Sequence, residues 1–78
     1  MSKNHAAAIL RWHEQVEQYF GGVESFDQSA TISTMLFGCQ SWLRNHAAGA
    51  SEAEIRQIEA IKAELEDWLE RRGLVFTQ

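Results

Sequence analysis

The feature that most constrains this chain is an amphipathic helix pattern in its last third. Apolar residues recur there at intervals of three or four, which places them on one side of an α-helix. They are Ile55, Ile58, Ile61, Leu65, Trp68 and Leu69. Ser51 precedes Glu54 by three positions, the spacing of a capping box at a helix N-terminus. Gly73 follows two arginines and suits a left-handed helix stop, so we predict a helix over residues 52–72.

Another helix is predicted near the start of the chain, over residues 3–20. Its apolar stripe comprises Ile9, Trp12, Val16 and the Tyr19/Phe20 pair, with Leu10 at the margin. The pair Gly21-Gly22 ends this helix. The connection that follows is short, which is typical of helices that pack as antiparallel neighbours.

The middle of the chain predicts a helix over residues 26–47. Its apolar positions follow the helical period at Ile32, Met35, Leu36, Cys39, Trp42 and Leu43. Ser25 and Gln28 repeat the capping-box spacing, although the weak helix propensity of the first turn leaves Ser29 as an alternative cap. Gly38 falls inside this helix, where we expect it to permit a close helix–helix contact.

These patterns predict an all-α protein with one domain over residues 1–78. The expected architecture is a small bundle of three antiparallel helices, followed by an apolar tail at residues 74–78. A chain this short buries only about 60% of its unfolded surface and is marginally stable alone. Its single cysteine cannot form an intramolecular disulfide. We therefore expect its three tryptophans and four phenylalanines to stabilise it through dense packing, through dimerisation, or through both.

The composition argues against several classes of function. The formal net charge is −4 and no basic stripe is present, so we expect no direct binding to nucleic acid. A helix-turn-helix regulator is disfavoured for the same reason, because its recognition helix carries basic residues. No run approaches the ~18 apolar residues of a membrane span. The lone cysteine and the absence of a signal-peptide pattern lead us to expect a cytoplasmic protein.

No residue pattern in the chain matches a catalytic, metal or cofactor motif. His13 and Glu17 are four positions apart and could share a metal on one helix face, but no H-E-x-x-H or C-x-x-C motif accompanies them. Cys39 and His46 are seven positions apart, which is about 10 Å along a helix and too far for a nucleophile–base pair. We therefore expect no enzymatic activity, no bound metal and no cofactor.

The residues left for a function lie on two kinds of surface. Three apolar residues fall outside the main stripes and are candidate contacts for a partner: Leu10, Phe37 and Phe76. Four acids on the outer side of the last helix are further candidates: Glu59, Glu66, Asp67 and Glu70. We expect a non-enzymatic protein that forms a homodimer, binds another protein, and occludes or bridges its surface.

The acidic helix also leaves two alternatives open. The plainer one is that its charges only keep the surface soluble, with pairs such as Asp67–Arg71 at i,i+4. The other is a small inhibitor that blocks the basic groove of a nucleic-acid-handling enzyme, as short helical proteins of phages and mobile elements do, anti-CRISPR proteins among them. That comparison rests on size and charge alone.

Overall fold

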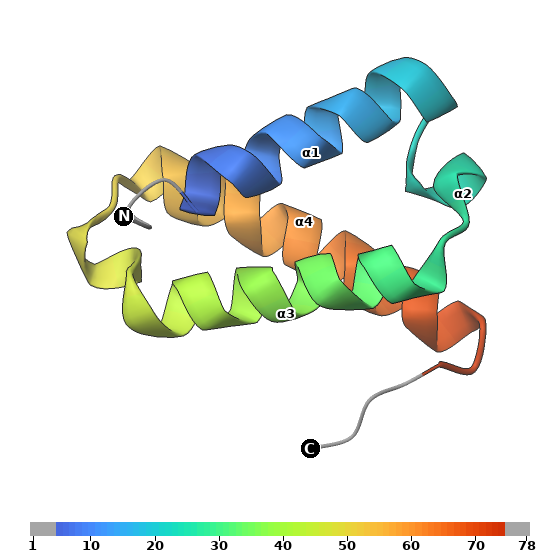
Figure 1. Ribbon diagram of the computed structural model, residues 1–78. Helices are drawn as coiled ribbons and strands as arrows, with labels where there is room; N and C mark the ends of the chain where they lie inside the picture. The colour runs from blue at the N-terminus through green and yellow to red at the C-terminus, as the bar shows by residue number, and fades with distance from the viewer. Residues whose placement is uncertain (1–4, 75–78) are drawn as a thin grey trace.

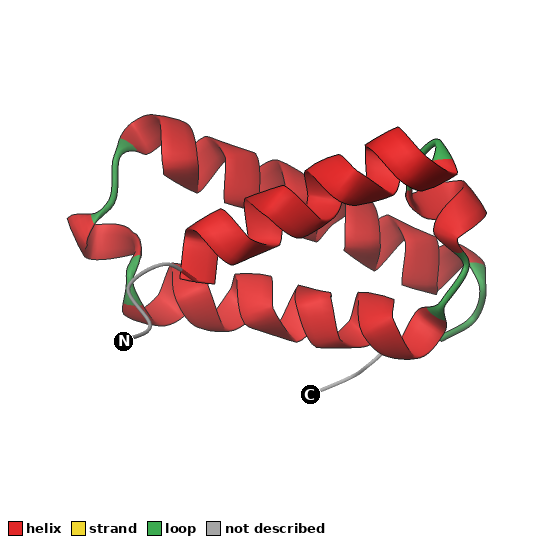
Figure 2. Cartoon of the chain, turned by 45° about the horizontal axis from the view of Figure 1, so that its top comes forward, coloured by secondary structure: helices red, strands yellow, loops and turns green. Residues whose placement is uncertain are grey.

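The computed structural model describes residues 5–74 and confirms the all-α bundle (Figure 1). Its elements are α1 (His5–Phe20), α2 (Val23–Phe26), α3 (Ser29–Asn45), the 3₁₀ helix η2 (Ala47–Gly49) and α4 (Glu52–Arg71). The helix α3 runs opposite in direction to both α1 and α4 (Figure 1). The loops lie at the two ends of the bundle (Figure 2). The three long helices α1, α3 and α4 therefore enclose one core. No strand occurs among the described residues.

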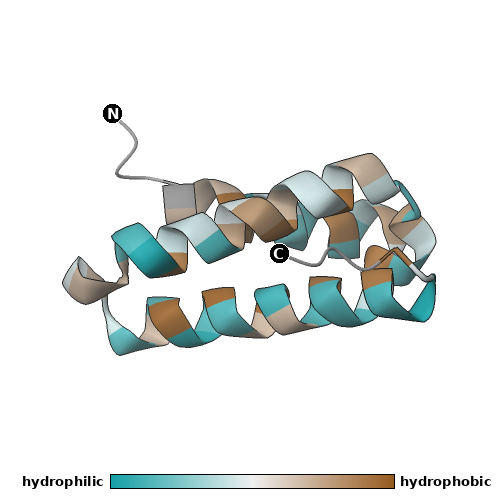
Figure 3. Ribbon diagram, turned by 90° about the horizontal axis from the view of Figure 1, so that it is seen from below, coloured by the Kyte–Doolittle hydropathy of each residue, from teal (hydrophilic) through white to brown (hydrophobic). Residues whose placement is uncertain are grey.

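The core is centred on the apolar stripe of α4. Ile58 and Leu65 are fully buried, and Trp68 is 1% exposed. They pack against buried residues of the other helices, which are Ala6, Ile9, Val16, Val23, Ile32, Leu36, Cys39 and Trp42. The hydrophobic residues of α4 face the other helices, whereas its outer side is hydrophilic (Figure 3). The apolar stripe predicted from the sequence is thus buried against other helices of the same chain.

Both predicted ends of α4 are confirmed by its hydrogen bonds. The Ser51 hydroxyl accepts a hydrogen bond from the Glu54 backbone N–H at 3.1 Å. At the other end, Gly73 has a φ of 72° and its N–H donates to the Glu70 carbonyl at 3.1 Å. The Leu74 N–H donates to the Leu69 carbonyl at 2.8 Å. These two bonds form a Schellman motif, in which a left-handed residue turns the chain away from the helix.

The predicted start of the middle helix is wrong. Ser25 lies inside the one-turn helix α2, and α3 begins only at Ser29, after Gln28 as N-cap without a side-chain cap. Asp27 separates the two helices with a φ of 51°. The reason is tertiary packing: the Phe26 ring meets Trp12 and Phe20 edge-on, at 5.8 and 5.0 Å between ring centroids. Pattern alone could not predict that aromatic cluster, which holds the chain in a separate turn.

The far end of the middle helix also differs, because α3 stops at Asn45 and η2 follows. The helix–helix contact expected at Gly38 is present. A Cβ at this position would lie 3.9 Å from Ile9 Cδ1, so α1 passes close to α3 there, at ordinary van der Waals contact.

A network of ion pairs joins α2 to the C-terminal end of α4. Arg71 pairs with Glu24 and, at 2.8 Å, with Asp67. Arg72 reaches Glu24 at 3.3 Å and lies over the Trp68 ring, 3.9 Å from its centroid. The hydrogen bond from Arg71 is the main cause that lowers the pKa of Glu24 below its ordinary value.

The two capping-box spacings give a matched test of the fold. Ser51→Ala should lower the free energy of unfolding by about 1 kcal/mol, because it removes an N-cap acceptor. Ser25→Ala should change it by less than about 0.5 kcal/mol, since Ser25 is exposed and caps no helix. Urea denaturation followed by circular dichroism measures both. Equal losses in the two variants would contradict the cap assignment.

The Glu24 network predicts a pH dependence. Because the folded-state pKa of Glu24 is lowered, its stabilising contribution is present above its ordinary pKa of 4.5 and is lost as the pH falls through the lowered value. Arg71→Gln should raise the pKa of Glu24, measured by an NMR titration of its carboxylate. Arg56→Gln is the control, because Arg56 pairs with Glu52 instead. An unshifted titration in the Arg71 variant would contradict the network.

Candidate functional site

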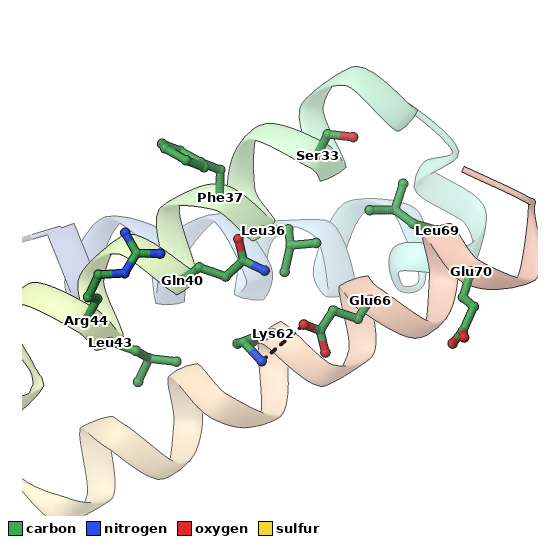
Figure 4. A pocket seen from close by; sticks show the side chains of 10 residues that line it. All are labelled: Ser33, Leu36, Phe37, Gln40, Leu43, Arg44, Lys62, Glu66, Leu69 and Glu70. Atoms are coloured by element: carbon green, nitrogen blue, oxygen red, sulfur yellow. Dashed lines mark ion pairs between the residues drawn. The ribbon is translucent and has the colours of Figure 1, made fainter. Parts of the chain in front are cut away.

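A groove lies between α3 and α4 (Figure 4). It has a volume of about 860 Å³. It is lined by Ser33, Leu36, Phe37, Gln40, Leu43, Arg44, Lys62, Glu66, Leu69 and Glu70. Its exposed apolar surface comes mainly from Phe37 and the half-buried Leu43, and several polar side chains also line it.

Phe37 is the most conspicuous side chain of this groove. It is 66% exposed, although the neighbouring Leu36 is buried in the core. Consecutive residues on an α-helix point about 100° apart, so burial of Leu36 turns Phe37 away from the core. Its ring projects away from α4 at the rim of the groove (Figure 4). The exposure that the sequence predicted for Phe37 is therefore present.

The charges of the groove are arranged along its length. Lys62 and Glu66 form an ion pair of 3.1 Å near its middle. Arg44 of α3 lies toward one end and Glu70 of α4 toward the other (Figure 4). Within residues 5–74, neither Arg44 nor Glu70 takes part in an ion pair. The groove thus has one cationic and one anionic end, both available to an incoming surface.

The structure divides the predicted partner-binding residues among three places. Phe37, Glu66 and Glu70 all line the groove. Leu10 instead lines a smaller cavity between α1 and α4, with His13 and Glu17. The other members lie apart from both. Glu59 and Asp67 are exposed on α4 outside the groove, and Phe76 lies outside the described residues.

The sequence interpretation missed two exposed aromatics and one cross-helix contact. Tyr19 and Phe20 belong to the predicted stripe of the first helix, but they are 72% and 47% exposed. The His13 Nε2 atom lies 2.8 Å from Glu64 Oε1 and 3.8 Å from Glu17 Oε2. Glu64 is 51 positions from His13, so no local spacing could signal this contact.

The lone cysteine has the environment of a core residue. Cys39 is fully buried. Burial raises the pKa of its thiol to about 11, and the nearby positive charge of Lys62 offsets only part of that effect. A thiol in this setting is protonated at neutral pH and is a poor nucleophile.

This burial predicts a slow thiol reaction. Native protein at pH 8 should react with Ellman's reagent at least about tenfold more slowly than the same protein unfolded in urea, because the thiolate forms only on opening. Absorbance of the released thionitrobenzoate measures both rates. Reaction of the native thiol at the unfolded rate would contradict the burial of Cys39.

Comparison with known proteins adds no functional assignment. No protein-family model matches the chain, and no curated protein or solved structure shows detectable similarity to it. Among the described helices, none combines the length and the apolar character that crossing a bilayer requires.

Proposed function

We propose that this chain is a non-enzymatic interaction protein that acts as a homodimer. The α3–α4 groove forms the contact between the two copies. The dimer then binds another protein and occludes or bridges its surface. The observation that carries this proposal is Phe37, an aromatic side chain that is 66% exposed beside an apolar groove.

The chemistry of Phe37 and the groove resembles that of protein interfaces. Large aromatic side chains are enriched at the centres of interfaces, where a few of them supply most of the binding energy. Here Phe37 of each copy supplies the anchor, and the half-buried Leu43 of the other copy supplies apolar surface beside it. Contiguous exposed apolar surface marks interaction sites, whereas single scattered apolar residues are ordinary on protein surfaces.

The charges of the groove favour a second copy as its occupant. Most homodimers have twofold symmetry, in which the same patch of each copy meets the other. A twofold axis across the middle of the groove reverses its direction in the second copy. The cationic end with Arg44 then faces the anionic end with Glu70 of the other copy, so the contact is complementary in charge at both ends.

The outer side of α4 remains available to a further protein partner in this arrangement. Glu59 and Asp67 lie there, outside the groove. Of the four acids first assigned to a partner surface, Glu66 is paired with Lys62 and Asp67 with Arg71. These ion pairs reduce the net negative charge on the outer side of α4. This reduction therefore supports a protein-binding dimer more than an inhibitor that imitates nucleic-acid charge.

A charge exchange tests the proposed contact. Arg44→Glu and Glu70→Arg should each weaken dimerisation by roughly tenfold or more, because each places like charges together at both ends of the interface. The double variant R44E/E70R should restore the wild-type dissociation constant, because it inverts every pair. Sedimentation equilibrium at low ionic strength measures all four proteins. Arg56→Glu is the control, since Arg56 is exposed on α4 outside the groove.

The apolar part of the contact has its own matched pair of variants. Phe37→Ser should weaken the dimer by at least about 30-fold, as expected for a central aromatic anchor. Tyr19→Ser removes a similarly exposed aromatic from α1 and should leave the dissociation constant unchanged. A monomeric wild type, a double charge variant that stays weakened, or a dimer lost through Tyr19 would each contradict the proposal.

A further inference from the structure

We propose that His13, Glu17 and Glu64 form a binding site for a divalent transition metal, with zinc as the best fit, that joins α1 to α4. The proposal is independent of the dimer contact, because none of these residues lines the α3–α4 groove. His13 and Glu17 are the pair that the sequence analysis considers as metal ligands and sets aside for lack of an accompanying motif. The fold supplies a third ligand from the distant helix α4.

The three side chains already converge on one point. One ligand atom from each lies within 4.8 Å of the others. His13 Nε2 is 2.8 Å from Glu64 Oε1 and 3.8 Å from Glu17 Oε2. Zinc ligands about 2.0–2.2 Å from the ion at a tetrahedral angle lie about 3.4 Å apart. The observed separations fall on both sides of that value, so small side-chain rotations bring the atoms into position.

The types of ligand favour zinc over harder cations. Zinc accepts both imidazole nitrogen and carboxylate oxygen as ligands, whereas magnesium and calcium prefer oxygen ligands alone. His13 and Glu17 stand one turn apart on α1, a spacing at which both side chains reach the same side of a helix. Glu64 approaches from α4, so the metal would contact two helices instead of one.

The surroundings leave room for a fourth ligand. The cavity beside the site has a volume of about 470 Å³, and His13 and Glu17 line it together with Leu10 and Ile61. A site with three protein ligands and an open side accepts a water molecule or an exogenous group. The side chain of His13 is 21% exposed, which shields one side of the site while the cavity gives access to the other.

A metal in this position would act as a cross-link between helices. Small domains without disulfides are often stabilised by a structural metal. Because the ligands converge only in the folded chain, binding of the metal stabilises the fold. The metal would replace the hydrogen bond between His13 Nε2 and Glu64 Oε1, because a nitrogen that binds zinc has no proton to donate, and α1 would then be joined to α4 through the ion.

The test uses the tag-free protein and zinc itself, followed by isothermal calorimetry at pH 7.5. We expect one zinc per chain, and a dissociation constant at least about tenfold weaker in each of His13→Gln, Glu17→Gln and Glu64→Gln. At zinc concentrations roughly 100-fold above that constant, the melting temperature of the wild type should rise by about 10 °C. Magnesium at the same concentration should leave it unchanged.

Two controls separate this site from binding elsewhere on the surface. His46→Gln removes another histidine, and Glu59→Gln removes another exposed carboxylate of α4; both should bind zinc as the wild type does. Circular dichroism confirms that each variant is folded. The Glu17 side chain is 57% exposed, so Glu17→Gln is the ligand variant least expected to disturb the fold. Absent zinc binding, or binding unchanged in the three ligand variants, would overturn the proposal. A loss confined to the two α1 variants would overturn the cross-helix site.

Discussion

Burial of the apolar stripe of α4 is the interaction on which the rest of this structure depends. A fully buried aliphatic or aromatic side chain contributes about 1.5–3 kcal/mol relative to an exposed one. Ile58, Leu65 and Trp68 are all buried to this extent, between α1 and α3. With 78 residues and a single cysteine, the chain cannot form an intramolecular disulfide, so its helices depend on this burial.

The functional surfaces follow from this packing. Because α3 turns Leu36, Cys39 and Trp42 toward the core, its neighbour Phe37 is left at the rim of the groove. Because α4 turns its stripe inward, its remaining sides carry charge, and the side next to α1 brings Glu64 to His13. The burial of these helix faces thus places both Phe37 at the groove and Glu64 beside His13.

Much of the fold could be predicted from residue spacing. The cap at Ser51, the stop at Gly73 and the stripe between them depend on neighbours along the chain, and all three are confirmed. The exposure of Phe37 followed from its position beside the stripe. The separate turn α2 could not be predicted, because it depends on Phe26 meeting side chains of another helix. Glu64 was missed for the same reason: its contact partner is distant in sequence.

The central claim is that the α3–α4 groove meets a second copy of the chain, and a dilution series of amide NMR spectra tests it most directly. The account predicts concentration-dependent shifts at Phe37, Gln40, Arg44, Glu66 and Glu70, with the Tyr19 end of α1 unchanged. Spectra that stay the same at every concentration would contradict the account. So would shifts that map to α1 while the groove residues stay fixed.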